Sequence, residues 1–311
     1  MGLLTLWLVS ASVFIMAYGV PNDPATVIAG KRATLEVVQR IHKELGLDRP
    51  LIVQYGDYMW HLIRFDLGQS YVSGGGTSVW SLISSSLPTT LWLVSGAGII
   101  WFSGGVFSGV VSAVRARSLL DRGLTAFVLV GLSVPPAVLY LLLMWGFFTG
   151  LRNANINIFD VGPAGSPFTD LPGFLSHMAL PWIGLAFLLM ATYTRLTRSS
   201  MLEVLSEDYI RTARAKGLSE QRIIYRHGLR AALTPVVTQF GVDLGSLVGG
   251  VLVTESVFGL QGVGQTAVHA LEVGDTPTVI GVALFVAVFV VLANLGVDLL
   301  YAFLDPRVRL A

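Results

Sequence analysis

The sequence predicts an all-α membrane protein with about six transmembrane helices. Three observations support this fold class. Hydrophobic residues make up 53% of the 311 residues and charged residues only 13%, and the mean hydropathy is +0.70. Soluble domains carry about twice that charged fraction, so this chain lacks the charges for a fully solvated surface. Windows of roughly 20 residues carry almost no charge, and most remaining charges lie between those windows.

Each apolar window is expected to form a helix, because the bilayer core offers no water to satisfy backbone polar groups. The expected spans are residues 1–20, 87–114, 123–150, 177–194, 231–254 and 278–300. Residues 1–20 lack a basic stretch and a small-residue cleavage site, which favours a membrane helix over a signal peptide. A short basic segment missing before Met1 is a further alternative for this end of the chain.

The basic residues predict the orientation, since cytoplasmic loops of membrane proteins are enriched in Lys and Arg. Most of the 20 basic residues lie between spans two and three, between spans four and five, and in the C-terminal tail. Residues 255–277, between spans five and six, contain acids but no Lys or Arg. We therefore expect both termini on the cytoplasmic side of the membrane.

Between the first two spans, residues 21–86 form a long extracytoplasmic segment with two candidate helices. The first covers about residues 37–45 and stops at Gly46, and the second starts at Pro50. The apolar face expected for the second helix comprises Ile52, Tyr55, Met59, Leu62 and Ile63. The sequence favours a cap packed on the membrane helices, and a landing surface for an external partner is compatible with it. Residues 87–303 form the transmembrane domain, with a loop at 198–230, and residues 304–311 form a cytoplasmic tail.

Motifs that would indicate an enzyme are absent from the sequence. It contains no G-x-x-x-x-G-K-[ST] phosphate loop, no H-E-x-x-H zinc pattern and no G-x-S-x-G nucleophile turn. The five histidines are scattered, and there is no cysteine for a disulfide or a thiolate metal site. We therefore expect no catalytic residue, no metal site and no cofactor in this chain, and an intramembrane enzyme has the least support.

Two acids lie inside expected spans, where a charge is costly and needs a reason. Asp243 follows Gln239 by four residues, so both lie on one helix face. Either this face lines a pathway for polar solutes, or it makes a hydrogen bond between helices. Asp298 follows Asn294 near the end of the last span, where a structural polar contact is favoured.

Glycine and proline patterns predict local features of the spans. Gly105 and Gly109, like the glycines of residues 241–249, repeat at four-residue spacing, which permits close approach of helix backbones within the chain or between chains. Pro135 and Pro136 are expected to kink the third span, since each removes a backbone donor. A static bend is favoured over a gating hinge.

A basic, helix-favouring stretch at residues 207–218 separates two apolar spans. We expect an amphipathic helix with Tyr209, Ala213 and Ile210 on one side and basic residues on the other, followed by a turn at Gly217. Ser219 is expected to cap a second short helix. The charge alone suits contact with anionic lipid. The small side chains and the glycine turn favour insertion into a groove on a soluble partner.

Several motifs resemble those of integral membrane subunits of bacterial ABC importers in the dipeptide, oligopeptide and nickel permease group. In that family a cytoplasmic loop carries E-A-A, three residues, Gly and an ending of I-x-L-P type. Residues 211–217 (RTARAKG) and 227–230 (HGLR) match these positions without the first Glu and the final Pro, in the form of the peptide permease branch. The other matching motifs are residues 21–24 (PNDP), 45–50 (LGLDRP), 54–55 (QY), 66–70 (DLGQS), 87–91 (LPTTL), 133–136 (SVPP), 255–264 (ESVFGLQGVG, with Gln261 in place of a proline), Asp298, Tyr301 and 305–307 (DPR).

This resemblance implies a permease subunit that forms half of an ATP-driven import pathway for peptides, with nickel or another small solute as the alternative substrate. Its loop would contain a coupling helix seated in a groove of a cytoplasmic ATPase, so ATP and magnesium would be bound by partner subunits. The residues implied in this contact are Asp208, Tyr209, Arg211, Thr212, Ala213, Arg214, Lys216 and Gly217.

The implied partners are a second homologous permease, two ATPase subunits, an extracytoplasmic substrate-binding protein and the lipid bilayer, with no nucleic acid. The implied location is the bacterial cytoplasmic membrane. A stand-alone secondary transporter is the alternative from another class. Such transporters show internal repeats and ionisable residues at mid-membrane, whereas no repeat is evident here and only Asp243 lies deep in a span.

Overall fold

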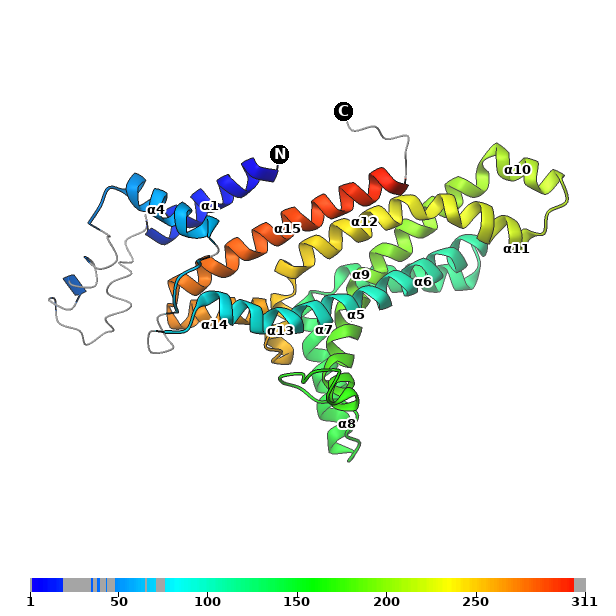
Figure 1. Ribbon diagram of the computed structural model, residues 1–311. Coiled ribbons are helices and arrows are strands. Elements are labelled where there is room, and N and C mark those ends of the chain that lie inside the picture. The colour runs from blue at the N-terminus through cyan, green and yellow to red at the C-terminus, as the bar shows by residue number, and fades with distance from the viewer. Residues whose placement is uncertain are drawn as a thin grey trace. The chain divides into compact units, whose positions relative to one another are not determined.

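The computed structural model describes residues 2–18, 35, 38–39, 43, 48–64, 66–70 and 76–304. Within these residues the chain is helical, and its only ladder contact is an isolated bridge between Gln69 and Ser78 (Figure 1). The elements are α1 (Gly2–Tyr18), α4 (Leu51–Ile63), α5 (Val79–Val114), α6 (Leu119–Ser133), α7 (Pro136–Leu143), η1 (Met144–Thr149), α8 (Gly150–Asn153), α9 (Leu171–Ser206), α10 (Asp208–Ala215), α11 (Glu220–Arg222), η2 (Ile223–Gly228), α12 (Leu229–Gly250), α13 (Leu252–Phe258), α14 (Val263–Val273) and α15 (Thr276–Leu304). The elements η1 and η2 are π-helical turns.

Three helices are long and apolar enough to cross a membrane: α5, α9 and the Thr276–Gly296 part of α15. The bent pair Leu119–Ser133 and Pro136–Asn153 makes a fourth if it acts as one span. The expected first and fifth spans coincide with α1 and α12, which are helical but are not among these candidates. The described chain is therefore an α-helical membrane protein with three or four candidate spans, and the count of six stays a prediction.

The helices extend beyond the apolar windows from which they were predicted. α5 begins at Val79 instead of residue 87, so residues 79–86 belong to a helix and not to the preceding loop. α9 begins at residue 171 because the Asp170 carboxylate accepts a hydrogen bond from the Gly173 N–H at 3.0 Å, which caps the first turn. It ends at Ser206, and the next residue, Glu207, has an extended backbone. A charge-free window therefore predicts only the apolar central part of such a helix and misses the turns that extend beyond it.

A sharp bend interrupts the expected third span. Ser118 caps α6 by accepting a hydrogen bond from the Asp121 N–H at 3.2 Å, and α6 ends at Ser133. Val134 and Pro135 then adopt extended backbone, because a residue that precedes proline is driven out of the helical region. The two helices that meet here are bent by 106°. The expected kink thus lies at Pro135 and Pro136, and their role as a gating hinge stays a prediction.

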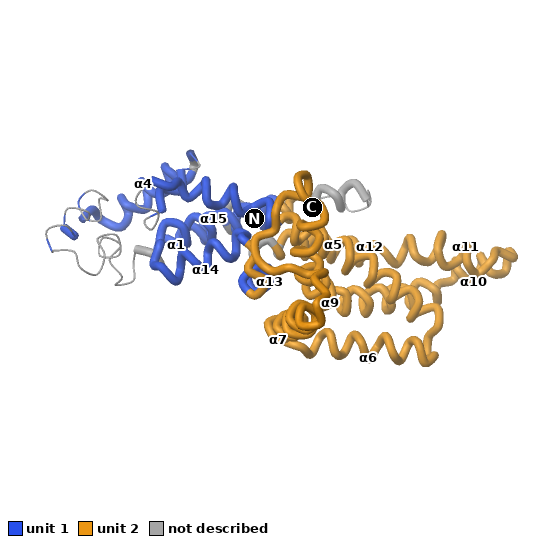
Figure 2. The backbone as a smooth tube through the Cα atoms, turned by 90° about the horizontal axis from the view of Figure 1, so that it is seen from below, with its two compact units in different colours: residues 1–90, 248–256, 261–292 blue, residues 91–247, 257–260, 293–311 orange. Residues whose placement is uncertain are grey.

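The chain forms two compact units, drawn in two colours in Figure 2. Unit 1 comprises Met1–Thr90, Val248–Ser256 and Gln261–Leu292. Unit 2 comprises Leu91–Leu247, Val257–Leu260 and Ala293–Ala311.

In unit 1, α4 packs on α1 through aromatic side chains. The Phe14 and Tyr55 ring centroids lie 5.2 Å apart, those of Phe14 and Tyr58 lie 5.5 Å apart, and the Ser10 Oγ and Tyr55 OH are 2.9 Å apart. The helix from Pro50 is confirmed, but the face expected for it is partly wrong, since Ile52 is 87% exposed. The two tyrosines, three residues apart, set the buried stripe instead. Most of the first candidate helix, near residues 37–45, lies outside the described residues, and its described residues 38–39 and 43 are helical. The motif at 21–24 and residues 305–311 lie outside the described residues.

A buried carboxylate in unit 1 explains the motif at residues 255–264. Glu255 accepts hydrogen bonds from the Thr90 Oγ1 at 2.6 Å and from the Gln265 N–H at 3.0 Å. The same Thr90 hydroxyl accepts from the Val263 N–H at 2.9 Å. A Cβ added to Gly262 would lie 2.1 Å from the Glu255 Oε1, so the carboxylate fits only beside a glycine. The spacing of Glu and Gly in this motif therefore builds the connection from α13 to α14.

In unit 2, the repeated glycines of α5 bring its backbone against α9. A Cβ added to Gly105 would lie 2.4 Å from the Tyr193 Cβ, and one added to Gly109 would lie 2.5 Å from the Thr197 Cβ. The hydroxyls of Ser108 and Thr194 lie 2.6 Å apart in the same interface. Of the two alternatives for this glycine repeat, the structure shows close packing of helices within the chain.

Candidate functional site

The basic stretch between α9 and α12 folds into a compact elbow, which we define as residues 207–228, containing α10, α11 and η2. It lies at one end of unit 2 in Figure 2. α10 ends at Ala215 and is followed, after Lys216, by a residue in the left-handed region, Gly217, with φ of 76°. The Gly217 N–H donates to the Arg214 carbonyl at 2.9 Å and the Leu218 N–H donates to the Ala213 carbonyl at 3.3 Å. This pair of hydrogen bonds is a Schellman motif, for which glycine is the residue with least strain.

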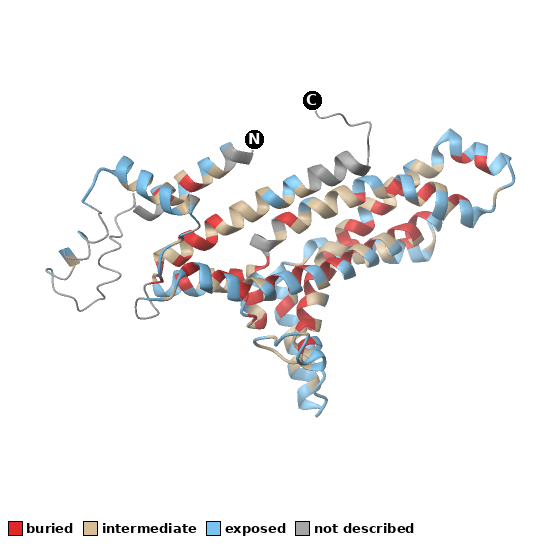
Figure 3. Ribbon diagram, viewed as in Figure 1, coloured by how far each residue is buried: buried red, intermediate tan, exposed pale blue. Residues whose placement is uncertain are grey.

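The elbow has a small hydrophobic core of its own. Ile210 and Ile223 are fully buried, Ala213 is 9% exposed, and Leu205 and Leu218 pack against them. Figure 3 shows this buried patch within an otherwise exposed α10 and α11. The core joins α10 to η2, so the elbow is a folded piece and not a flexible loop.

The expected faces of α10 need correction. Tyr209 is 47% exposed, whereas Ile210 is fully buried, so Ile210 and not Tyr209 shares the inner face with Ala213. An eight-residue helix is too short for its sequence to fix the buried stripe, and here the contact with Ile223 fixes it. The other predicted coupling residues, Asp208, Arg211, Thr212, Arg214, Lys216 and Gly217, are exposed.

Exposed ion pairs lie on the outer surface of the elbow. The Arg214 Nε lies 2.8 Å from the Glu220 Oε1 and links α10 to α11, and the Arg211 Nη1 lies 3.4 Å from the Asp208 Oδ1. Pairs as exposed as these stabilise a fold by about 0–1 kcal/mol. Partial burial and the nearby Glu207 carboxylate raise the pKa of Tyr209 above its ordinary value. The surface therefore presents guanidinium, ammonium and phenol groups to solvent or to a partner.

Ser219 does not cap in the way the sequence predicts. It stands at the N-cap position of α11 with extended backbone, but its hydroxyl makes no capping hydrogen bond. The Ser219 carbonyl accepts from the Ile223 N–H at 3.0 Å instead. The second helix is thus started by the Schellman turn and by the buried Ile223.

Beneath the elbow, a bundle-end cluster joins α5, α9 and α12. Its buried members are Val110, Ala113, Met201 and Ala232. Leu205 packs against both this cluster and the elbow core. An uninterrupted apolar contact therefore runs from the elbow into the helices of unit 2.

Gln239 and Asp243, the two residues predicted for the pathway, belong to a polar contact between α9 and α12. The Asp243 carboxylate accepts from the Tyr193 hydroxyl at 2.8 Å and from the Gln239 side-chain amide at 2.8 Å. Sequence reasoning missed Tyr193, which is fully buried in an apolar helix. The hydrogen bond between helices, one of the two alternatives for this face, is present, and its role in a pathway stays a prediction. The side chain of Asp298 lies outside the described residues.

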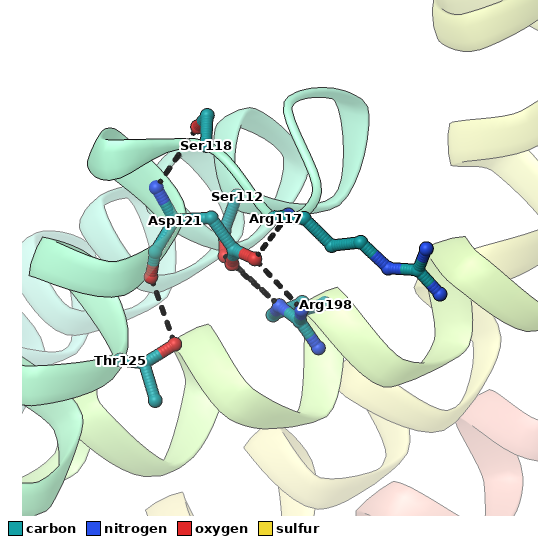
Figure 4. Close-up of polar contacts among 6 residues, drawn as sticks. All are labelled: Ser112, Arg117, Ser118, Asp121, Thr125 and Arg198. Carbon is teal, nitrogen blue, oxygen red and sulfur yellow. Dashed lines mark hydrogen bonds and ion pairs between the residues drawn. The ribbon is translucent and has the colours of Figure 1, made fainter.

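A second polar cluster, which sequence reasoning also missed, ties α6 to α9 near the elbow (Figure 4). The Arg198 Nε and Nη2 donate to the two Asp121 oxygens at 2.8 Å and 2.9 Å. The Ser112 hydroxyl also donates to Asp121, and the Arg117 N–H donates to it at 2.8 Å. We call this set the Asp121–Arg198 clamp.

The Asp121 carboxylate of the clamp is buried and fully paired. Asp121 is 5% exposed, whereas the Arg198 side chain is 33% exposed, so solvent partly screens the pair. Arg117 adopts φ of 66°, a strained value for a residue with a side chain, and this turns its N–H toward the carboxylate. The Ser118-x-x-Asp121 spacing is a helix-start signal that could have singled out Asp121, but no local pattern pairs it with Arg198.

The described chain, with its three or four candidate spans and its folded basic elbow, is an α-helical multi-pass membrane protein. Residues 105–310 match the family described as "Binding-protein-dependent transport system inner membrane component", and residues 1–94 match the corresponding N-terminal family. The chain belongs to this family, and it is the permease subunit of an ABC importer of the peptide and nickel permease group in a bacterial inner membrane. Such a permease is not an enzyme, since ATP hydrolysis takes place in separate subunits.

Relatives match the chain over nearly its whole length. A putative peptide transport system permease protein of Brucella abortus (strain 2308) is 40% identical over 304 residues, covering 97% of this chain and 94% of the relative. The di/tripeptide transport system permease protein DppB of Pseudomonas aeruginosa (strain UCBPP-PA14) is 37% identical, covering 98% and 95%. The glutathione transport system permease protein GsiC of Escherichia coli O6:H1 is 36% identical, with the same coverage. Binding-protein-dependent transport implies partner ATPase and substrate-binding proteins.

Proposed function

We propose that this chain forms half of the translocation pathway of a peptide importer. The names of three relatives that align with almost the whole chain refer to peptide, di/tripeptide and glutathione transport, and they support this substrate class. The other half would be a second, homologous permease. Two ATPase subunits would bind the ATP and magnesium, and an extracytoplasmic binding protein would deliver the substrate.

The proposed topology has six spans, with α1 and α12 as the first and fifth. Both termini and the elbow then lie in the cytoplasm, which agrees with the basic residues around the elbow. Residues 1–20 form the first span, 21–86 the extracytoplasmic segment, 87–303 the permease domain with its loop at 198–230, and 304–311 the tail. The α5 boundary at Val79 moves the start of the second helix into the extracytoplasmic segment.

The observation that carries the proposal is the folded elbow on the end of α9. The hydrophobic core formed by Ile210, Ala213 and Ile223 stabilises the shape of the elbow, and the outer surface of the elbow is basic. We propose that this surface seats in a groove of the ATPase, so that closure of the two ATPases displaces the elbow as a rigid body. Asp208, Tyr209, Arg211, Thr212, Arg214 and Lys216 would meet the ATPase, whereas Ala213 and Gly217 would act from within by shaping the elbow.

Charge reversal on the elbow tests this docking. The double variant Arg211→Glu with Lys216→Glu keeps the buried core, so the chain is expected to insert normally. Its affinity for the ATPase subunits should fall at least about tenfold, which corresponds to ~1.4 kcal/mol, and ATP-driven peptide uptake should fall with it. Co-purification and uptake into proteoliposomes measure the two effects.

Arg152→Glu is the matched control, because Arg152 is an exposed arginine on α8, outside the elbow. It should leave ATPase binding unchanged. The chain contains no cysteine, so a single cysteine at Ala215 also reports the side of the membrane. Full uptake by the double variant, or labelling of that cysteine from outside intact cells, would contradict the proposal.

A further inference from the structure

The helix α6 is held to α9 in two different ways. Toward its bent end the contact is apolar: the Phe127 and Phe187 ring centroids lie 5.0 Å apart, and a Cβ added to Gly131 would lie 2.8 Å from the Ala191 Cβ. Apolar contacts of this kind are non-directional, and packed helices can slide along them. At the elbow end the contact is the Asp121–Arg198 clamp, which is directional.

The clamp fixes both the position and the rotation of α6. A planar guanidinium that donates two parallel hydrogen bonds to a carboxylate specifies one relative geometry. The Arg198 Nε also lies 3.0 Å from the Ser112 Oγ, so the same side chain reaches α5. The Arg117 N–H, in the turn between α5 and α6, donates a hydrogen bond to the same carboxylate. Three helices and one turn therefore meet at a single buried carboxylate (Figure 4).

The clamp lies close to the packed side chains that connect the elbow to the helices of unit 2. Arg198 and Met201 lie on the last turns of α9, and Met201 belongs to the bundle-end cluster. Leu205, one turn further on, packs on both that cluster and the elbow core. A displacement of the elbow thus reaches the α9 segment that carries Arg198 through packed side chains.

We propose that Asp121 and Arg198 are the positioning pair that passes a displacement of the elbow to α6, and so to the bent segment at residues 136–153. This inference rests on the proposed function, since it needs an elbow that ATPases move. It goes beyond docking of the elbow on an ATPase. Asp121 and Arg198 lie outside the elbow, and the proposal is that they transmit its displacement to the membrane helices. Without the clamp, α9 is expected to slide past α6.

The test compares Asp121→Asn, Arg198→Lys and wild type in the full complex in proteoliposomes. The asparagine keeps the shape of the carboxylate but removes its charge, and the lysine keeps the charge but loses the planar fork. Both variants are expected to assemble with the ATPases and hydrolyse ATP, with uptake per ATP hydrolysed reduced at least about tenfold. Arg195→Lys, at an exposed arginine three residues earlier on α9, is the matched control and should keep the wild-type ratio.

A distance measurement separates positioning from a merely structural role. Spin labels on cysteines introduced at Ser206, at the end of α9, and at Leu129, 62% exposed on α6, report the separation of the two helices. In wild type this distance should stay the same when vanadate replaces the released phosphate and traps ADP in the ATPases, because the helices move together. In Asp121→Asn it should shift or broaden on trapping.

Each outcome decides the proposal. A wild-type ratio of uptake to hydrolysis in both variants overturns it, as does a helix separation in Asp121→Asn that does not respond to trapping. If Asp121→Asn does not fold, the ratio of uptake to ATP hydrolysis and the distance between the spin labels are measured in Arg198→Lys and Ser112→Ala instead. Failure of the proposed function has a different signature: the wild-type elbow would then not bind the ATPases at all.

Discussion

Ile210→Asp is expected to abolish ATP-driven uptake while the chain still inserts in the membrane. Ile210 is fully buried in the elbow core, between Ala213 and Ile223. An unpaired carboxylate there costs about 4 kcal/mol or more, which exceeds what so small a core supplies. The elbow would unfold, and no rigid surface would remain for the ATPases. Uptake into proteoliposomes and co-purification with the ATPase subunits measure the loss.

Ile210→Val is the matched control, because it removes only one methylene group from the same site. Such a change costs about 0.5–1.5 kcal/mol in a core, so the elbow should stay folded and uptake should remain close to wild type. If Ile210→Asp supported normal uptake, the elbow core would not be needed for coupling.

Gly109→Ala is expected to destabilise the whole bundle. A Cβ at Gly109 would lie 2.5 Å from the Thr197 Cβ and 2.8 Å from the Thr194 carbonyl oxygen, and this backbone atom cannot rotate away. α5 and α9 would have to separate, and overpacking of this kind costs about 1–3 kcal/mol. The variant should show a lower unfolding temperature in detergent and a smaller monodisperse fraction in size-exclusion chromatography.

Gly123→Ala provides the opposite case in the same fold. Gly123 lies within α6, and a Cβ there would have no neighbour within 4 Å. Alanine is favoured over glycine in a helix interior by about 1 kcal/mol, so this variant should be as stable as wild type or more so. Equal unfolding temperatures for Gly109→Ala and Gly123→Ala would contradict the close packing of α5 on α9.

Features that depend on local chain chemistry were predictable from the sequence. The break at Pro135 and Pro136, the helix after Pro50 and the turn at Gly217 follow from backbone restrictions within a few residues. The α5 glycine repeat correctly indicated a close helix contact, although its partner α9 became evident only in the structure.

Features that depend on distant partners were not predictable. Nothing in α10 shows that Ile210 is buried and Tyr209 exposed, because the deciding contact is with Ile223, beyond the turn. The Asp121–Arg198 clamp joins residues 77 positions apart. Arg198 looked like one more basic residue of a cytoplasmic loop, and only tertiary packing distinguishes it from Arg195.

The burial of the Asp121 carboxylate gives the two electrostatic contacts of this subunit different responses to ionic strength. Mobile ions screen exposed charges over a Debye length that shrinks from about 10 Å at 0.1 M to about 3 Å at 1 M salt. The exposed cations of the elbow are subject to this screening, so concentrated salt is expected to weaken the docking proposed for them. Asp121, 5% exposed, is reached by few dissolved ions. Concentrated salt is thus expected to weaken the proposed contact with the ATPases more than it weakens the Asp121–Arg198 clamp.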